Sequence, residues 1–343
     1  MKQMRAVRFY APRDIRLESV AVPEPGTGEV LLKVGAALTC GTDLKAYRQG
    51  HKLLLGKLPA PFGHELAGTV AAVGRGVEGF RIGDRVAAAN SAPCGDCHFC
   101  ARGEERLCER LLLHNGAYAE YDLIPERIVR RNLWKLPDGL AFADAALSEP
   151  LACALHAVDA MRIEAGETAA VLGAGAMALL LVQALRARGA RVLVAGRGRD
   201  KLAAALKAGA GEAFSALDGE LAAAVRAACG GRGADCVFEA VGTEATWRQS
   251  VEMARRGGRV CLFGGCAPGT TVPIDAHRLH YEQLELRGVF HHAPLYFKQA
   301  LDLLCAGRVP TSLLVGRSIR LEDVPAFFER FQAGSAPKAA VLP

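Results

Sequence analysis

Four cysteines crowd one short segment of this chain, at Cys94, Cys97, Cys100 and Cys108. Gaps of two residues allow neighbouring thiolates to face a common centre, and the fourth cysteine completes the tetrahedron that Zn²⁺ prefers. A site with four protein ligands has no open coordination position, so this metal would hold a loop together without taking part in a reaction. The spacing therefore predicts a structural zinc site.

Disulfide bonds and an iron–sulfur cluster are the alternative uses of these cysteines. Residues 1–7 are charged and lack the apolar core of a secretory signal peptide, which argues against an oxidising compartment. The bacterial ferredoxin run has a shorter final gap followed by proline, and no proline follows Cys108. The chain has 11 cysteines and no targeting segment, so we expect a reducing cytoplasmic location in which the remaining thiols are small buried hydrophobes.

Length and charge narrow the class of protein. A chain of 343 residues is expected to form two domains, and its hydrophobic fraction of 51% is ample for two cores. The formal charge of +6 comes from scattered basic residues without interleaved aromatic residues, so nucleic acid binding is not predicted. Gly173 and Gly175 divide the apolar run at residues 169–185, which favours a buried strand, turn and helix over a membrane span.

The two halves of the chain differ in pattern. Before residue 155, short strands alternate with proline and glycine residues, and strands are predicted at 30–34 and 65–73. After residue 155, buried strands alternate with helices, which indicates parallel βαβ units. Here we predict strands at 168–172, 190–195, 234–239 and 259–263, and helices at 176–188 and 201–208.

The C-terminal part returns to the first half. A helix is predicted at 295–304, and mixed structure follows from 309 to 343. We therefore expect an α/β protein with a β-rich domain, residues 1–155 and 291–343, and a doubly wound parallel-sheet domain, residues 156–290.

A glycine-rich turn marks a candidate nucleotide site. The sequence G-A-G-A-M-A at residues 173–178 fits G-x-G-x-x-G/A. Gly173 permits the tight turn, Gly175 lets the backbone approach a pyrophosphate, and Ala178 keeps the helix close to the strand. A tight loop without a ligand is the alternative, but the position between a buried strand and a helix favours dinucleotide binding.

The end of the next strand indicates which dinucleotide is bound. NAD-binding domains place an acidic residue there, on the ribose 2′-hydroxyl. This strand ends in Gly196, which is followed by Arg197 and Arg199. Guanidinium groups suit a 2′-phosphate, so NADP(H) is predicted over NAD(H). The alternative is that both arginines are solvated and Asp200 turns inward.

A second group of metal-binding residue types is dispersed along the sequence. Cys40 lies in C-G-T-D, His64 and Glu65 in G-H-E, and Glu149 before Pro150. Each is unremarkable alone. Together they supply thiolate, imidazole and carboxylate, the ligand set of an open zinc site that has room for a substrate.

These motifs resemble those of the zinc-dependent medium-chain dehydrogenase/reductase superfamily, and most closely its polyol branch, the sorbitol and L-iditol 2-dehydrogenases. The resemblance covers essentially the whole chain: C-G-T-D, G-H-E, the four-cysteine segment, S-E-P-L-A, G-A-G and G-R-G-A-D. It implies a GroES-like catalytic domain with two zinc ions, a Rossmann domain, and an assembly of two or four identical chains.

The resemblance also implies roles for single residues. Cys40 and His64 are expected to bind the catalytic zinc. Glu149 matches the acidic ligand of the polyol and threonine branches, acting directly or through water, and Glu65 matches an exchangeable ligand. Thr42 matches the hydroxyl that relays the alcohol proton.

Asp43 matches the carboxylate that orients the ligand histidine. The residues expected to contact the cofactor are Gly173, Gly175, Ala176, Met177, Gly196, Arg197, Arg199, Phe263 and Phe290.

Some positions depart from the polyol pattern. Lys45 lies where many relatives have a relay histidine, and His291-His292 replace Arg-Tyr near the substrate. These histidines would contact substrate hydroxyls or serve the structure. Asn90 and Ser91 replace the histidine that threonine dehydrogenases have in this region, which weakens the threonine interpretation.

The activity expected from the resemblance is hydride transfer between a secondary alcohol, such as a polyol or sugar alcohol, and NADP(H). A threonine-type or a broad secondary-alcohol dehydrogenase is the alternative among enzymes. A zinc-ribbon nucleic-acid-binding protein and a catalytically silent binding protein are the alternatives outside that class.

Overall fold

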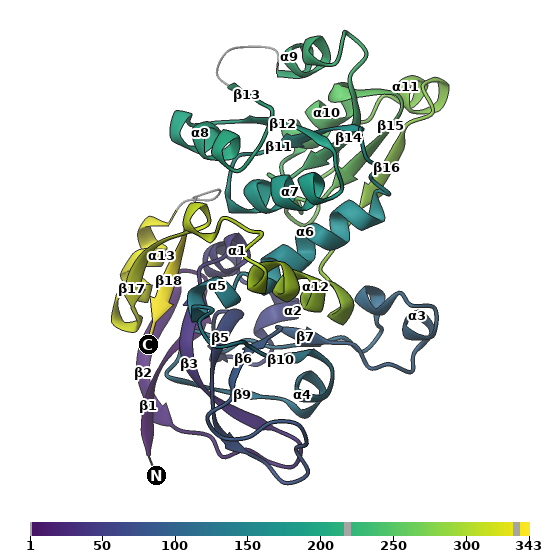
Figure 1. Ribbon diagram of the computed structural model, residues 1–343. Coiled ribbons are helices and arrows are strands. Elements are labelled where there is room, and N and C mark those ends of the chain that lie inside the picture. Colours follow the sequence, from purple (N-terminus) through teal and green to yellow (C-terminus); the bar gives the residue numbers. More distant parts are fainter. Residues whose placement is uncertain (1, 216–220, 332–336) are drawn as a thin grey trace. The chain divides into compact units, whose positions relative to one another are not determined.

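The strands form two groups, and each group builds its own core. The computed structural model describes residues 2–215, 221–331 and 337–343 (Figure 1). The chain divides into unit 1, Met1–Ala152 with His292–Pro343, and unit 2, Cys153–His291. These division points lie within three residues of the boundaries expected at 155 and 290.

Unit 2 contains a parallel sheet. Its described strands follow the spatial order β13-β12-β11-β14-β15-β16. They are β11 Thr168–Leu172, β12 Arg191–Gly196, β13 Glu212–Ser215, β14 Ala234–Glu239, β15 Ala254–Leu262 and β16 Glu285–Gly288. The chain leaves β11 toward one edge of the sheet and then crosses back to β14, so the order reverses between β11 and β14. Open α/β sheets bind ligands at such a reversal, beyond the carboxyl ends of the strands.

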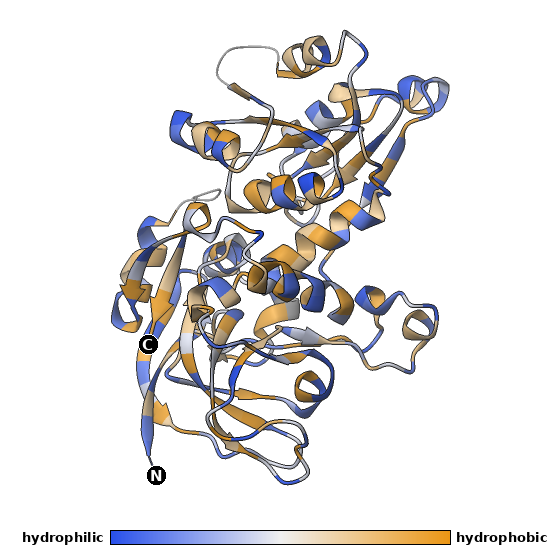
Figure 2. Ribbon diagram, viewed as in Figure 1, coloured by the Kyte–Doolittle hydropathy of each residue, from blue (hydrophilic) through white to orange (hydrophobic). Residues whose placement is uncertain are grey.

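Helices cover both faces of this sheet. Helices α7 and α8 pack together against β11, β12 and β13, whereas α9 and α10 pack together, α10 against β14 and β15. Their bounds are α7 Ala176–Ala187, α8 Arg199–Lys207, α9 Leu221–Ala228, α10 Glu244–Met253 and α11 Ala276–Tyr281. Figure 2 shows β11, β14 and α7 as predominantly hydrophobic, as expected for elements between two layers. The predicted doubly wound sheet is confirmed.

The predicted bounds of β11 and β14 agree with the structure, but β15 starts earlier than predicted. It begins at Ala254 rather than at residue 259, because Ala254 pairs with Ala234 before a shift in register. Gly257 and Gly258 lie inside this strand, and Gly257 has a φ of 66°. Consecutive glycines are unusual inside a strand, and here they belong to an irregularity in the pairing of β15 with β14.

Unit 1 is built mainly from antiparallel strands. The larger sheet has the order β10-β6-β5-β3-β18-β17 with β9 beside β3, and the smaller sheets are β2-β1-β4 and β7-β8. The strands are β1 Gln3–Ala11, β2 Asp14–Ala21, β3 Val30–Leu38, β4 Ala60–Pro61, β5 Glu65–Val73, β6 Arg85–Ala88, β7 Ser91–Ala92, β8 Leu112–Leu113, β9 Tyr121–Ile124, β10 Leu133–Lys135, β17 Val315–Arg320 and β18 Lys338–Leu342.

Short helices connect these strands. They are α1 Gly41–Gln49, α2 Lys52–Leu55, α3 His98–Ala101, α4 Glu126–Asn132, α5 Phe142–Ala145, α6 Ser148–Ala160, α12 Pro294–Cys305 and α13 Val324–Arg330, with 3₁₀ turns at Glu105–Leu107, Thr311–Leu313 and Leu321–Asp323. Helix α6 begins in unit 1 and ends in unit 2.

An aromatic cluster joins the C-terminal segment to the N-terminal strands of unit 1. The ring of Phe328 lies 5.4 Å from Phe62, 6.0 Å from Tyr118 and 5.8 Å from Tyr47, measured between centroids. Each such pair contributes about 0.5–1.5 kcal/mol beyond the area it buries. Helix α13, which carries Phe328, therefore completes a core in unit 1.

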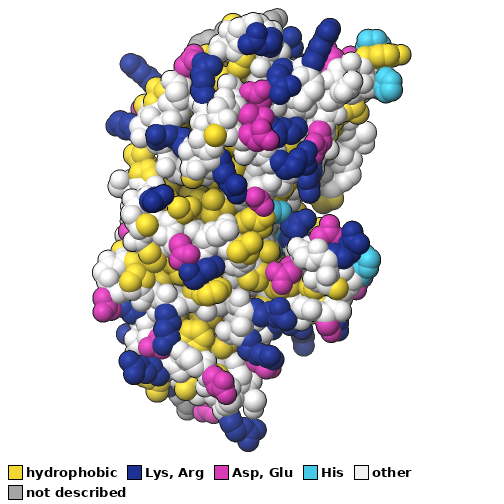
Figure 3. Space-filling view, turned by 45° about the vertical axis from the view of Figure 1, so that its right-hand side comes forward, with side chains coloured by type: hydrophobic (Ala, Val, Ile, Leu, Met, Phe, Trp, Pro, Cys, Tyr) yellow, Lys and Arg dark blue, Asp and Glu magenta, His cyan; other side chains and the backbone are white. Residues whose placement is uncertain are grey.

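The surface charge and the length of the helices concern two classes of partner, nucleic acids and membranes. On the face drawn in Figure 3, basic and acidic side chains are interspersed. Among the helices described here, none is both long and apolar enough to cross a membrane.

A partly buried ion pair stabilises the loop that precedes β9. Nε2 of His114 lies 3.0 Å from both carboxylate oxygens of Asp122. Burial alone would lower the pKa of His114, but the carboxylate outweighs it and raises that pKa above its ordinary value. The raised pKa means that the charged imidazole stabilises the folded state at low pH.

The pair predicts a pH-dependent stability. A histidine with a raised folded-state pKa gives its full contribution below about pH 6.5, its unfolded value, and loses it as the pH rises through the folded value. His114→Gln should therefore cost about 2 kcal/mol at pH 6 and less at pH 9. Urea unfolding of the zinc-replete protein measures the difference, with His277→Gln, an exposed histidine, as control. Equal costs at both pH values would contradict this account.

Candidate active site

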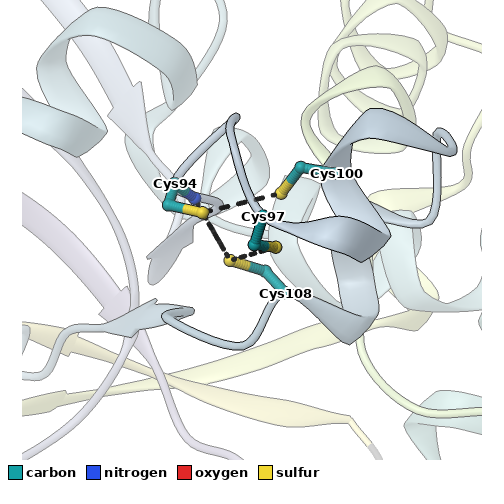
Figure 4. A group of neighbouring side chains, drawn as sticks. All are labelled: Cys94, Cys97, Cys100 and Cys108. Carbon is teal, nitrogen blue, oxygen red and sulfur yellow. Dashed lines mark hydrogen bonds between the residues drawn. The ribbon is translucent and has the colours of Figure 1, made fainter.

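The four cysteines of the first motif converge on one point. Figure 4 shows Cys94, Cys97, Cys100 and Cys108 with their sulfur atoms turned toward one another. The sulfur of Cys108 lies 3.4 Å from that of Cys94 and 3.9 Å from that of Cys97, and Cys94 and Cys100 are 3.9 Å apart. Tetrahedral zinc with Zn–S bonds of 2.3 Å requires sulfur separations of about 3.8 Å. The geometry fits a zinc ion with four thiolate ligands.

The surrounding backbone favours negative charge on these sulfurs, but only in part. N–H of Cys94 donates to the sulfur of Cys108 at 3.2 Å, and N–H of Gly95 donates to that of Cys100 at 3.4 Å. Backbone N–H groups lower the pKa of Cys97 to about 6, whereas burial raises the pKa of Cys100 to about 12. Four thiolates therefore need a cation among them, which zinc would provide.

A second donor cluster lies where α1 and β5 begin. Donor atoms of Cys40, His64 and Glu65 all lie within 4.8 Å of one another. Cys40 is the N-cap of α1, and its sulfur accepts from N–H of Thr42 at 3.4 Å. Helix starts favour negative charge, so this position suits a thiolate. Thiolate, imidazole and carboxylate are thus brought together from separate parts of the chain, and this donor set fits zinc.

A carboxylate fixes the orientation of His64. Nδ1 of His64 lies 2.8 Å from Oδ1 of Asp43, and the hydroxyl of Tyr118 lies 2.5 Å from Oδ2 of Asp43. Burial alone would lower the pKa of His64, but Asp43 outweighs it and raises that pKa well above its ordinary value. With Nδ1 held by the carboxylate, Nε2 is the nitrogen left to face a metal, an arrangement common among ligand histidines.

Lys338, which the sequence analysis did not single out, lies against Glu65. Its Nζ is 2.7 Å from Oε1 and 2.8 Å from Oε2 of Glu65, and it donates to the carbonyl of Thr39 at 3.0 Å. Burial alone would lower the pKa of Lys338, but the carboxylate outweighs it and raises that pKa. Lys338 thus contacts both carboxylate oxygens of Glu65, and Lys338 and a metal would share this carboxylate.

Glu149 is placed apart from the close group of three donors. It lies in the first turn of α6, and its Oε1 is 3.8 Å from Nε2 of His292. Both side chains are buried. Burial raises the pKa of Glu149 to about 7. Of the two acids expected to bind the catalytic metal, Glu65 therefore lies in the close group with Cys40 and His64, whereas Glu149 lies near His292.

The two residues expected to move the alcohol proton lie on α1. Thr42 is half-buried in the first turn of the helix, next to Cys40, and Lys45 is exposed three residues later. Residues three apart share a helix face, so Thr42 and Lys45 lie on one side of α1.

The glycine turn has the geometry expected of a phosphate-binding site. Gly173 follows β11 with a φ of 128°, which a residue with a side chain rarely adopts. Gly175 is the N-cap of α7 and brings no side chain to the helix start. Ala176, Met177 and Ala178 form the first turn of this helix. Backbone N–H groups at a helix start bind phosphate.

The other expected cofactor residues also lie beyond the carboxyl ends of the strands of unit 2. Arg197 and Arg199 follow β12 and are exposed, Phe263 follows β15, and Phe290 lies beyond β16 and is 58% exposed. Asp200 is exposed in the first turn of α8, so it does not turn inward.

Gly196 packs closely against the glycine turn. A Cβ atom at this position would lie 2.7 Å from Cβ and 3.1 Å from N of Ala174. This backbone therefore has no room at position 196 for the acidic residue that would bind a ribose hydroxyl.

The buried ion pair at Glu65 yields a prediction. Lys338→Met should destabilise the protein by about 3–5 kcal/mol, because it leaves the buried carboxylate without its cation. A second change, Glu65→Gln, should recover much of that loss. Lys298→Met, which breaks an exposed pair with Asp302 one helical turn away, should cost under about 0.5 kcal/mol. The measurement is the denaturant midpoint of the wild type, of the two single lysine variants and of the double variant. An equally small loss of stability in both lysine variants would refute the role given to Lys338.

Two family models match this chain. The alcohol dehydrogenase GroES-like domain matches residues 26–138, and the zinc-binding dehydrogenase domain matches residues 176–306.

Relatives match over nearly the whole length. A sorbitol dehydrogenase of Bacillus subtilis (strain 168) is 31% identical over 96% of this chain and 94% of its own. An L-threonine 3-dehydrogenase of Bacillus velezensis is 31% identical over 95% of both chains. The crystal structure of a zinc-binding dehydrogenase from Sinorhizobium meliloti 1021, bound to NADP, matches with a TM-score of 0.92 and 31% identity over 100% of both chains. This chain belongs to the zinc-dependent medium-chain alcohol dehydrogenase family, whose members join a GroES-like domain to a Rossmann domain.

Proposed function

We propose that this dehydrogenase oxidises a secondary alcohol, of the polyol or sugar-alcohol class, to a ketone with NADP⁺ as the hydride acceptor. The alcohol carbon loses a hydride to the nicotinamide and the hydroxyl loses a proton, so the products are ketone, NADPH and H⁺. The observation that carries the proposal is the donor cluster of Cys40, His64 and Glu65, with Asp43 behind the histidine.

Cys40 and His64 would hold the catalytic zinc, with Glu65 or Glu149 as the acidic ligand. When bound, zinc supplies Lewis acidity, which lowers the pKa of an alcohol and polarises a carbonyl in the reverse direction. The chain contributes the orientation of the imidazole through Asp43. Lys338 orients the carboxylate of Glu65 through contacts with both of its oxygens. A second zinc, at the four cysteines, would serve folding only.

The alcohol proton needs a route to water. The hydroxyl of Thr42 is next to Cys40 and half-buried, so it would accept the proton from the alcohol and pass it on. Lys45 is exposed on the same face of α1 and stands where many relatives have a histidine. We propose that Thr42 hands the proton to solvent beside Lys45.

The preference for NADP(H) rests on the residues at the carboxyl end of β12. Gly196 has no room for a carboxylate, and the guanidinium groups of Arg197 and Arg199 are exposed immediately beyond it. Arginine binds phosphate through two parallel hydrogen bonds, which suits a 2′-phosphate. The NADP held by the Sinorhizobium relative accords with this choice.

The threonine-type alternative has the Bacillus velezensis relative in its favour. In this chain, Asn90 and Ser91 stand in the segment where threonine dehydrogenases have their histidine. The carbonyl of Asn90 accepts from N–H of His114 at 2.8 Å, and that of Ser91 accepts from the amide of Asn132 at 3.0 Å. Both residues are buried. We therefore favour a polyol over an amino alcohol.

A turnover screen tests the proposed substrate class. The zinc-replete protein is assayed with polyols, threonine and simple secondary alcohols, each with NADP⁺ and NAD⁺, by nicotinamide absorbance. The expected result is the highest kcat/KM for a polyol with NADP⁺. Turnover of threonine without polyol turnover would replace the proposal with its alternative, and no turnover with any alcohol would favour a silent binding protein.

Cys40→Ser tests the catalytic donor set. We expect kcat to fall about 10³-fold or more, because several kcal/mol of charge stabilisation are lost. Metal content should fall from two zinc ions per chain toward one, while NADPH binding persists. Cys305→Ser, which removes an exposed thiol, is the control. Unchanged turnover and metal content in the Cys40 variant would rule out this donor set.

Arg197→Ala with Arg199→Ala tests the cofactor preference. Loss of hydrogen bonds to a charged phosphate should raise the Kd for NADPH about 10- to 100-fold. The Kd for NADH should stay the same, since NADH has no 2′-phosphate. Arg232→Ala, at an exposed arginine before β14, is the control. An equal effect on both cofactors would refute the phosphate contact.

The assembly of two or four identical chains and the cytoplasmic location remain predictions. Sedimentation of the purified protein and fractionation of the source cells would test them.

A further inference from the structure

Glu239 is a buried acid at the carboxyl edge of the unit 2 sheet, and none of the roles above uses it. It is the last residue of β14 and pairs in register with Leu172 of β11 and Leu262 of β15. Leu172 directly precedes Gly173, the first glycine of the phosphate turn. Glu239 therefore lies where the strand order reverses, next to the candidate cofactor site.

The carboxyl group of Glu239 binds the turn that follows it. The side chain is fully buried. Its Oε1 accepts from N–H of Val241 at 2.8 Å and from N–H of Gly242 at 2.9 Å. Its Oε2 is buried and has no hydrogen-bond partner within the described part of the chain. Burial raises the pKa of this carboxyl group. A buried carboxyl group is costly unless it is hydrogen-bonded, and the N–H groups of Val241 and Gly242 supply such bonds here.

Gly264, two residues beyond the end of β15, also lies against this carboxyl group. A Cβ atom on Gly264 would lie 2.6 Å from Oε2 of Glu239 and 2.4 Å from N of Gly242. The indole N–H of Trp247 donates to the carbonyl of Gly264 at 2.8 Å. The ends of β14 and β15 are thus packed around the carboxyl group without space for a side chain at position 264.

The turn at residues 240–242 borders the phosphate turn directly. A Cβ atom on Gly173 would lie 3.3 Å from Cγ2 of Val241 and 3.4 Å from the carbonyl oxygen of Ala240. Val241 is 44% exposed, a large exposed fraction for an apolar side chain at this edge. Any movement of this turn would therefore change the surface that the glycine turn contacts.

Starting α10 does not require Glu239. The helix has its own capping box, in which Thr243 accepts from N–H of Thr246 at 3.2 Å and Thr246 accepts from N–H of Thr243 at 3.2 Å. The two N–H groups that Glu239 binds precede this box. Its carboxyl group therefore fixes residues 240–242 in particular, beside the glycine turn.

We propose that Glu239 is a positioning residue of the cofactor site. It holds the turn at residues 240–242 against the glycine turn, so that the dinucleotide binds to a preformed surface. This role rests on the proposed function, because it assumes that unit 2 binds a nicotinamide dinucleotide. Glu239 acts through Val241 and Gly242 and is not expected to touch the reacting atoms.

Equilibrium binding of NADPH to the zinc-replete protein tests this role. Glu239→Leu removes the acceptor, and the freed N–H groups would turn toward water and shift the turn. The Kd for NADPH should rise at least about tenfold by fluorescence titration. Glu239→Gln keeps an acceptor oxygen and should stay within about threefold of the wild type. Without cofactor, amide hydrogen exchange at residues 240–242 should accelerate in the leucine variant alone.

Ser250→Ala separates this role from a general loss of stability. Ser250 is buried on α10, one helical turn beyond Trp247, and its hydroxyl donates to the carbonyl of Trp247 at 2.6 Å. This variant should unfold at a lower temperature and yet bind NADPH with the wild-type Kd. A weakening equal to that of Glu239→Leu would reduce Glu239 to a stability role and overturn the proposal.

The remaining outcomes are also decisive. A folded Glu239→Leu protein with the wild-type Kd overturns the positioning role. If that variant does not fold, Glu239→Asp replaces it, because a side chain one methylene shorter cannot reach both N–H groups. An aspartate variant with unchanged Kd and unchanged exchange then overturns the role. A wild-type protein that binds neither NADPH nor NADH would instead contradict the proposed function itself.

Discussion

The buried pair of Lys338 and Glu65 is the contact on which unit 1 depends most. It joins residues 273 positions apart and lies where β18 pairs with β3. One interaction therefore ties the C-terminal strand to Glu65, a candidate metal ligand. Desolvating two charges is costly, and their attraction compensates only when the geometry is good. Here Nζ meets both carboxylate oxygens and a backbone carbonyl. The same lysine therefore completes the fold and limits the freedom of a candidate metal ligand.

The two units use different structural principles to place functional groups. In unit 1, donors come from loops and helix starts around an antiparallel sheet, and each is fixed by a neighbour, as His64 is by Asp43. In unit 2, the parallel sheet brings the ends of β11, β12, β14 and β15 to one edge, so that backbone and glycine positions define the site. The first principle suits a metal, whose ligands must be oriented side chains. The second suits a phosphate group, which backbone N–H groups can bind.

Much of this organisation could be predicted from the sequence because the signals are local. The cysteine spacing specifies a tetrahedron within one loop, and the apolar runs of β11 and β14 have no competing pattern. The extent of β15 was not predictable, because Gly257 and Gly258 favour a turn and only pairing with Ala234 keeps the strand going. Lys338 was missed for a different reason. Lysine is rarely buried, and no local pattern signals a partner so far along the chain. The approach of His292 to Glu149 is likewise a product of tertiary structure.

The close contact between Gly196 and Ala174 has a consequence for the evolution and redesign of cofactor choice. In many dinucleotide-binding folds a single acidic substitution would be the first step from a phosphorylated to an unphosphorylated cofactor. Here the contact of 2.7 Å that a new Cβ would make with Ala174 blocks that step until position 174 becomes smaller or the backbone moves. The two positions are thus coupled, and an acidic residue at position 196 calls for a second change. The methyl group of Ala174 thus limits which residues position 196 can hold.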